Sequence, residues 1–333
     1  MSLKTIQTPT LEIGYYEHGP PSGWPVVLSH GFPYDIHSFD EVAPRLASKG
    51  ARVIIPYLRG FGPTRFLSAP TMRTGQQAAL GSDVIDLLDA LGIEKAILAG
   101  FDWGGVASCV ATALWPERVD GLVSYAGYDI VDRASGGNPS VPSLEYVQWY
   151  QHLFQLERGR ACLSQHRRDL CRLLWQQWSP TFSFSDSFFE RTAASFDNPD
   201  FVDIVIHAYR FCFGSEEGDP VLQSLEDRLA SKPQLTVPSI TLDGLQDPLK
   251  PGGTAGHSGM FSGGRLTLVM RFPWKHRKLS PMLFWRSTNG ERPVLVVWLM
   301  SEVEFSLIAR GRFMEKVLCI NEQQMHVSPK PLY

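Results

Sequence analysis

Short apolar runs alternate with helical patterns along the first third of the chain. The runs with strand character are rich in β-branched residues and bounded by glycine or proline; they cover residues 10–17, 26–29, 52–56, 96–99 and 122–125. Residues 75–91 form an amphipathic pattern, with one helical face made of Ala79, Val84, Leu87, Leu88 and Leu91. This order predicts βα units, with a mostly parallel central sheet and helices packed against it.

The pattern changes after about residue 128. A loop rich in Gly, Pro and Ser at 132–143 leads into residues 144–213, which have the pattern of several helices dense in Trp, Phe and Tyr. A strand pattern returns at 239–242. We therefore predict a first core part over residues 1–128, a helical cap over 129–234, a second core part over 235–270 and an atypical tail over 271–333.

Composition limits the class of protein. Of the 333 residues, 44% are hydrophobic and 20% are charged, which is typical of a globular chain with a sizeable core. The formal net charge is -3, and the chain has no long block of like charge. It therefore lacks the positive electrostatic field that attracts a phosphate backbone, and nucleic acid is not expected as a partner. The five cysteines are widely spaced and include no C-x-x-C pair, so we expect buried thiols and no metal site.

No segment has the pattern of a membrane span or of a secretory signal. The longest apolar run, residues 294–300, is far shorter than the roughly 20 residues that cross a bilayer. Residues 1–10 are polar and lack an apolar centre. We therefore expect a cytoplasmic protein, with a peroxisomal location left open if the true C-terminus differs.

The sharpest motif is G-F-D-W-G-G at residues 100–105, between the strand pattern at 96–99 and a helical pattern at 106–114. A strand, a tight turn of small residues and a helix are the setting of a nucleophile elbow, which exposes one side chain on a strained turn. Most such elbows carry Ser, whereas this one carries Asp102. A carboxylate can attack an sp³ carbon and form an ester that water later cleaves. The alternative is that Asp102 caps the helix that begins at Trp103.

Two further loops favour the catalytic alternative. S-H-G-F-P at 29–33 follows the strand pattern at 26–29, where an oxyanion-hole loop belongs, so the backbone N–H groups of Phe32 and Trp103 are placed to hold negative charge. Y-L-R-G-F-G-P at 57–63 follows the next strand pattern. These three segments, in this order, resemble the α/β-hydrolase group that contains epoxide hydrolases and haloalkane dehalogenases, over about residues 13–256.

The resemblance implies an α/β-hydrolase fold with an inserted helical cap and Asp102 as the nucleophile. It places His30, Gly31, Phe32, Pro33 and Trp103 at the oxyanion hole and the substrate-binding wall.

The same resemblance implies three more catalytic groups. Asp247, in D-G-L-Q-D-P at 243–248, would orient the catalytic histidine, and Asp243 is the weaker candidate because it lies nearer the strand end. Epoxide hydrolases use two cap tyrosines to donate hydrogen bonds to the epoxide oxygen, and Tyr150 and Tyr209 match them. The alternative is that both tyrosines are core aromatics of the Trp-rich segment.

The resemblance breaks after a strand pattern at 265–270. The family has a G-H-x-x-P loop here, whereas this chain has R-F-P-W-K-H-R-K at 271–278. His276 is the best stand-in for the general base, because His257 follows Asp247 too soon. Residues 266–286 can be back-translated into codons. If these codons are read in the frame that starts at their third base, they can encode the missing motif followed by an apolar helix. We therefore predict that the residues beyond about Gly264 come from a frameshifted or mis-spliced reading, and that such a chain keeps its ester once formed.

These observations predict a hydrolase that opens an epoxide to a vicinal diol without a metal or organic cofactor, because the electrophile is already strained. The aromatic cap predicts a small lipophilic substrate. One alternative is a haloalkane or haloacid dehalogenase that uses the same Asp102, with Trp103 and either Trp149 or Trp175 binding halide through the indole N–H. The other is a catalytically impaired relative that acts in binding or as a scaffold.

Overall fold

The computed structural model describes residues 2–125, 127–180, 182–244, 247–249, 260, 267–272 and 304–306. One sheet forms its centre, with the strand order β1-β2-β4-β3-β6-β7-β8-β9-β10 and with β5 paired to β2. The strands are β1 (Lys4–Gln7), β2 (Leu11–His18), β3 (Trp24–Ser29), β4 (Ala51–Pro56), β5 (Arg65–Phe66), β6 (Ala96–Gly100), β7 (Val119–Tyr125), β8 (Ser239–Gly244), β9 (Thr267–Phe272) and β10 (Glu304–Ser306). The helices are α1 (Val42–Ala47), α2 (Gln77–Ala90), α3 (Trp103–Leu114), α4 (Pro142–Val147), α5 (Trp149–Phe154), α6 (Glu157–Trp178), α7 (Asp186–Ala193), α8 (Phe201–Cys212) and α9 (Gln223–Ala230).

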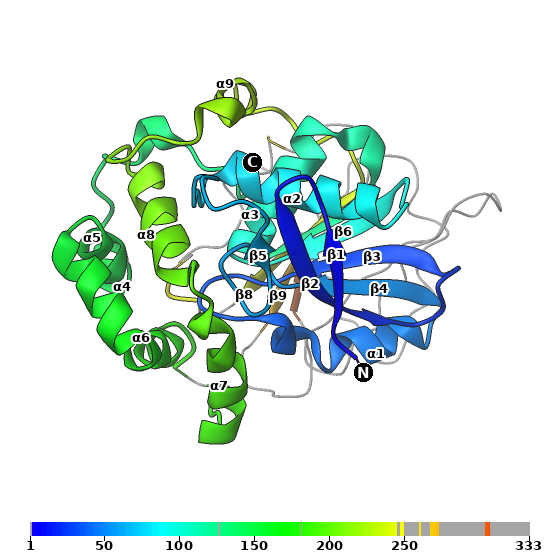
Figure 1. Cartoon of the computed structure of the whole chain (residues 1–333), viewed down its shortest axis with the longest axis horizontal. Helices are drawn as coiled ribbons and strands as arrows, with labels where there is room; N and C mark the ends of the chain where they lie inside the picture. The colour runs from blue at the N-terminus through cyan, green and yellow to red at the C-terminus, as the bar shows by residue number, and fades with distance from the viewer. Residues whose placement is uncertain are drawn as a thin grey trace.

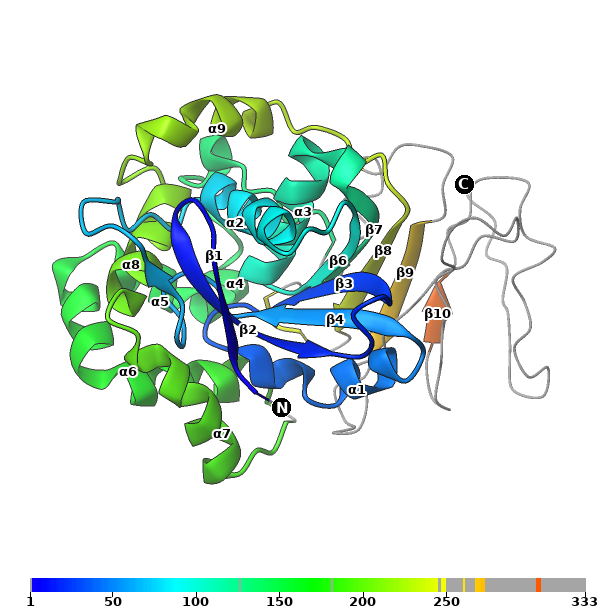
Figure 2. The same cartoon turned by 45° about the vertical axis from the view of Figure 1, so that its right-hand side comes forward.

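The inner strands β3, β4, β6, β7, β8 and β9 run parallel, whereas β1, β2 and β10 join them in antiparallel pairs at the two ends of the sheet. Helices α2 and α3 lie on one face of the sheet and α1 on the other (Figure 2). Strands β3 and β6 are mostly buried, which explains why they are nearly continuous apolar runs. The predicted α/β architecture with a mostly parallel sheet is confirmed.

The helices between β7 and β8 fall into two groups. Helices α4 to α8 gather beyond one end of the sheet (Figure 1), whereas α9 packs against α2 and α3. The carboxylate of Glu226 on α9 accepts hydrogen bonds from the Gln77 amide at 3.1 Å and from the backbone N–H of Ala78 at 3.0 Å. The range 129–234, which we predict as the cap, thus contains one helix that packs on the core.

A buried ion pair fixes the loop after β4 to helix α2. The guanidinium of Arg59 donates to both carboxylate oxygens of Asp83, at 2.7 and 2.6 Å, and to the backbone carbonyl of Thr74 at 2.9 Å. Two parallel N–H···O bonds of this kind set both distance and orientation. The loop that follows β4 is therefore held rigidly beside the carboxyl ends of the inner strands.

Several elements have no clear signal in the sequence. Strand β1 is mostly exposed and pairs only with β2, so its residues show little apolar alternation. Helix α1 is six residues long, too short to display a helical period. Among the helices that the structure describes, none is long and apolar enough to cross a membrane.

Candidate active site

Asp102 occupies a strained turn between β6 and α3. Its backbone has φ 52° and ψ -125°, in the left-handed region that side chains other than glycine seldom adopt. A Cβ on Gly104 would lie 2.0 Å from the backbone oxygen of Ser29, so the glycine lets α3 approach β3 this closely. The Asp102 side chain makes no capping hydrogen bond to α3, which disfavours the capping alternative. The strand, turn and helix have the geometry of a nucleophile elbow.

The loop after β3 contacts the side chain of Asp102. The backbone N–H of Phe32 donates to Asp102 Oδ1 at 2.7 Å. A Cβ on Gly31 would lie 2.4 Å from the Cβ of Asp102 and 2.6 Å from its Oδ1, so only glycine leaves room for this approach. Trp103 is the first residue of α3, so its N–H has no acceptor within the helix. Gly31, Phe32 and Trp103 therefore lie around Asp102.

The ring of Phe32 joins this loop to the helices beyond the sheet. Its centroid lies 5.6 Å from the ring of Trp103, 5.7 Å from Tyr209 and 6.4 Å from Tyr150. The ring of Phe32 is completely buried. The elbow, the loop after β3 and the two predicted cap tyrosines thus meet in one aromatic cluster.

Tyr150 on α5 and Tyr209 on α8 are neighbours, with ring centroids 5.3 Å apart and ring planes at 88°. Burial raises the pKa of both phenols, and the negative charge of Asp102 raises each further. The hydrogen bond that the Gln151 amide donates to the Tyr150 oxygen at 2.9 Å acts in the opposite direction on the pKa of Tyr150. Both phenols are therefore protonated at neutral pH and lie within electrostatic reach of Asp102.

Asp247 lies at the same edge of the sheet, after β8. Its Oδ2 accepts a hydrogen bond from the Tyr125 hydroxyl at 3.0 Å, and its Oδ1 accepts one from the Leu249 N–H at 2.9 Å. Burial raises the pKa of Tyr34, and the charges of Asp102 and Asp247 raise it further, so this phenol lies near both carboxylates. The alternative acid Asp243 lies within β8, in backbone register with residue 271 of β9, and not in the loop that follows.

His30 supports the loop after β3. The two ring nitrogens of His30 contact the backbone, with Nε2 accepting from the Leu58 N–H at 3.2 Å and Nδ1 lying 3.2 Å from the Gly31 carbonyl. Its ring is fully buried, and burial lowers its pKa to about 4. His30 therefore holds the backbone of this loop, whereas the family resemblance implies that it lies at the oxyanion hole or in the substrate-binding wall.

Two tryptophans that the sequence suggests as halide ligands are engaged with protein oxygens. The indole N–H of Trp149 donates to Gln177 Oε1 at 2.8 Å, and that of Trp175 donates to the backbone carbonyl of Pro33 at 2.9 Å. A halide could bind either indole only after one of these hydrogen bonds is broken.

The predicted general base, His276, and its alternative, His257, lie outside the described residues. Within the described ranges, no three His, Cys, Asp or Glu side chains are grouped as metal ligands would be. The described groups at the carboxyl edge are therefore a carboxylate on an elbow, a second carboxylate and buried phenols.

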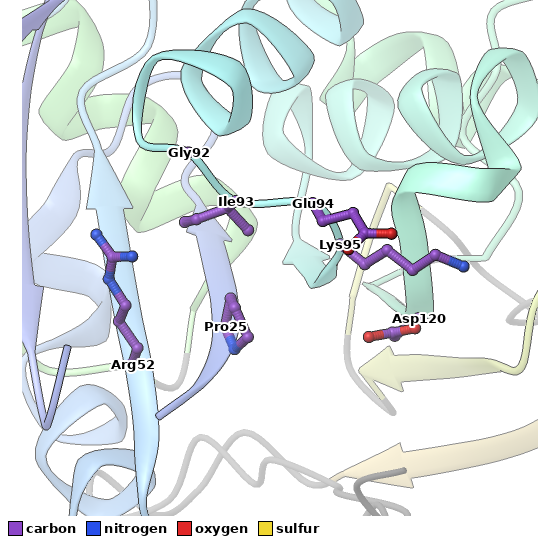
Figure 3. Close-up of a pocket in the computed structure, with 7 residues that line it drawn as sticks. All are labelled: Pro25, Arg52, Gly92, Ile93, Glu94, Lys95 and Asp120. Carbon is purple, nitrogen blue, oxygen red and sulfur yellow. The ribbon is translucent and has the colours of Figure 1, made fainter. Parts of the chain in front are cut away.

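A depression of about 420 Å³ lies at the opposite edge of the sheet (Figure 3). Its wall includes Arg52, Glu94, Lys95 and Asp120, near the amino ends of the inner strands, so basic and acidic side chains balance. Arg52 already donates to Glu17 at 2.6 Å. The depression is remote from Asp102. The basic and acidic side chains named in its wall differ from the carboxylates and buried phenols near Asp102.

Sequence reasoning missed three polar neighbours of the site, Tyr34, Tyr125 and Gln151. Tyr34 directly follows the 29–33 motif and Gln151 directly follows Tyr150. Tyr125 ends the strand next to β8. Adjacency to a motif, or to the carboxyl end of a neighbouring parallel strand, is the signal that could have identified them.

Comparisons with known proteins agree with this architecture. A family model described as alpha/beta hydrolase fold matches residues 25–303. Epoxide hydrolase 3 of Siraitia grosvenorii is 36% identical over 120 residues, which are 36% of this chain and 36% of that protein. Epoxide hydrolase B of Mycobacterium tuberculosis is 32% identical over 146 residues, or 40% of each protein. The chain thus matches less than half the length of these curated relatives.

A solved structure covers more of the chain. The crystal structure of a candidate epoxide hydrolase from Klebsiella pneumoniae is similar with a TM-score of 0.80 and 45% sequence identity. The similarity covers 82% of this chain and 89% of that one.

Proposed function

Because the chain belongs to the α/β-hydrolase-fold family, we propose that it opens a small lipophilic epoxide through an ester on Asp102. The carboxylate of Asp102 carries the proposal: it stands on a strained elbow, makes no capping bond and is held at Oδ1 by the Phe32 N–H. The relatives named as epoxide hydrolases support the substrate class.

In the first step, Asp102 attacks one carbon of the epoxide ring. A bond forms between Asp102 Oδ2 and that carbon, the C–O bond of the ring breaks, and the electron pair stays on the epoxide oxygen. Because the leaving alkoxide is strongly basic, a proton donated in the transition state typically contributes about 10²–10⁴-fold. Tyr150 and Tyr209 lie within reach of Asp102 and remain protonated at neutral pH, which suits them to this role.

In the second step, water attacks the ester carbonyl and releases the diol. The N–H of Phe32, which already contacts Asp102 Oδ1, would hold the negative charge that develops on that oxygen. We assign Asp247 to a water-activating pair with a histidine, for which His276 is our candidate. Without that histidine the ester would persist.

The proposal is tested by incubating the full chain with styrene oxide and measuring intact mass and diol. We expect one epoxide equivalent per chain, with peptide mapping at Asp102, and we expect none in Asp102→Asn. The matched control is Asp89→Asn, which removes a carboxylate that pairs with Arg118 at the surface. Absence of both adduct and diol with the folded wild-type chain would refute the proposal.

The dehalogenase alternative needs an indole N–H for halide, and Trp149 and Trp175 already donate to protein oxygens. Halide leaves without a proton, whereas an epoxide oxygen needs one. Tyr150→Phe should therefore slow the opening of styrene oxide and leave the reaction with 2-bromoethylbenzene unchanged. Equal loss with both reagents would argue against Tyr150 as an acid.

A further inference from the structure

A tight turn over residues 31–34 carries the backbone N–H that contacts Asp102. The N–H of Tyr34 donates to the carbonyl of Gly31 at 2.8 Å and closes the turn. That carbonyl shares its peptide unit with the N–H of Phe32, which donates to Asp102 Oδ1 at 2.7 Å. The two hydrogen bonds are therefore joined in series through one planar peptide unit.

A side chain from the helices beyond the sheet extends this series by one bond. The indole N–H of Trp175, on α6, donates to the carbonyl of Pro33 at 2.9 Å. This carbonyl shares its peptide unit with the N–H of Tyr34, the donor that closes the turn. Three hydrogen bonds thus run head to tail from the indole, through two peptide units of the turn, to the carboxylate of Asp102.

We propose that Trp175 is a positioning residue that acts on Asp102 through this turn, by aligning and polarising the Phe32 N–H for cleavage of the ester. The inference rests on the proposed function and concerns its second step. Each proton of the series stays on its own nitrogen, so neither a proton nor an electron is transferred along it.

The indole of Trp175 is held in a fixed orientation by other rings. It is 2% exposed, and the ring of Tyr34 stacks on it with centroids 4.7 Å apart and ring planes at 15°. The rings of Phe184 and Phe189 contact it edge-on, each with its centroid 5.2 Å away. Because the stacked ring and the two edge contacts fix the plane of the indole, its N–H stays directed at the Pro33 carbonyl.

Burial joins the effects of the three bonds. Gly31, Phe32 and Pro33 are buried together with the indole of Trp175. In such surroundings each hydrogen bond polarises the next one in a chain, by about 10–30% per bond. A carbonyl that accepts a hydrogen bond makes the N–H of the same peptide unit a better donor. The donor at the end of the series, the Phe32 N–H, is therefore both aligned and strengthened by the indole.

The two steps of the proposed reaction make different demands on this donor. When the ester carbonyl is attacked, negative charge develops on Asp102 Oδ1, and a preorganised N–H aimed at that oxygen stabilises the charge. When the epoxide opens, the carboxylate instead loses charge as its Oδ2 bonds to carbon, so a stronger donor at Oδ1 provides no such stabilisation. We therefore expect Trp175 to influence ester cleavage more than ring opening.

The test removes the indole N–H and keeps the shape of the ring. Benzothienylalanine, in which sulfur replaces the indole N–H, is incorporated in place of Trp175 in the full chain. The chain is treated with styrene oxide, and the ester on Asp102 and the diol are measured after timed acid quenches. Once excess epoxide is removed, decay of the ester is followed by intact mass in buffer and with hydroxylamine. Hydroxylamine attacks the same carbonyl without a protein base, releases the diol and leaves a hydroxamate on Asp102.

We expect the ester to decay about tenfold more slowly without the indole N–H, the rate equivalent of one hydrogen bond, and ring opening to stay within about twofold of wild type. Trp175→Phe, which also lacks the donor, should show the same loss confined to the second step. The matched control carries the same sulfur replacement at Trp178, whose indole N–H donates to the Val147 carbonyl at 3.5 Å. Both of its rates should equal those of the wild type.

Equal slowing of ring opening and ester decay would overturn the inference, because it would indicate a structural role for Trp175. An equal loss at Trp178, unchanged ester decay, or a folded wild-type ester that hydroxylamine does not cleave would overturn it as well. In all these cases the wild-type chain still forms the ester, so the proposed function stands. If the wild-type chain forms neither ester nor diol, the proposed function fails and the inference fails with it.

Discussion

Replacing Gly31 by alanine would displace the proposed nucleophile, Asp102, without changing its carboxyl group. The added Cβ would lie 2.4 Å from the Cβ of Asp102, 2.9 Å from its Cγ and 2.6 Å from its Oδ1. Comfortable contact between carbon atoms begins near 3.5 Å. The Gly31 loop and the elbow would therefore have to separate by about 1 Å, and the 2.7 Å bond from the Phe32 N–H to Asp102 would lengthen with them.

Two effects of different size follow from this displacement. Overpacking of a well-filled site typically costs about 1–3 kcal/mol of stability, which a folded chain can tolerate. Misplacing a reacting group by about 1 Å can cost about 10²-fold in rate. We therefore expect Gly31→Ala to fold and to open styrene oxide at least about 10²-fold more slowly than the wild type.

The assay compares initial rates of ring opening and urea unfolding for Gly31→Ala and for Gly137→Ala. A Cβ on Gly137 meets no atom within 4 Å, so this control should keep both the wild-type rate and the wild-type stability. If folded Gly31→Ala opens the epoxide within about twofold of the wild-type rate, the close approach of the loop to Asp102 does not set catalysis.

Two further predictions concern stability. Arg59→Met should lower the free energy of unfolding by about 3–5 kcal/mol in urea titrations, because Asp83 would keep a buried charge without its partner; a loss below about 1 kcal/mol would contradict this. In the folded chain the pKa of His30 is about 4, below its ordinary value of 6.5. As the pH drops from 6.5 toward 4, the unfolded chain therefore binds a proton at His30 before the folded chain does, and the free energy of unfolding falls. The loss from this group should be about 2 kcal/mol at pH 5, measured as the pH-dependent difference between wild type and His30→Asn, and parallel pH profiles would refute it.

The elbow could be predicted from the sequence because its geometry depends on local residues. A strand followed by closely spaced glycines leaves few conformations, and Asp102 adopts the strained one. The cap tyrosines could be predicted only through the family resemblance, since the segment contains many buried aromatic residues. The hydrogen bond between Gln151 and Tyr150 depends on side-chain rotamers, and the contact of Tyr150 with Tyr209 depends on the packing of α5 against α8, which no sequence pattern specifies.

Other features depend on long-range packing. A helical pattern can show which face of a helix is apolar but not which helices cover it, and α9 packs on α2 and α3. Glu226 is an acidic residue in that helix that would ordinarily be exposed, yet it is buried against the start of α2. The partners of Asp247 likewise come from β7 and from the loop after β8, and only the fold brings Tyr125 to it.

The single ring of Phe32 has a consequence for how substrate preference could be altered. Its backbone N–H donates to Asp102, the proposed nucleophile, while its side chain is packed among the aromatic residues of α5 and α8. A substitution in those helices that enlarges or narrows the binding space would shift this ring and, through it, the donor aimed at Asp102. For the proposed reaction we therefore expect specificity and turnover to change together, and variants that change one without the other should preserve the volume around Phe32.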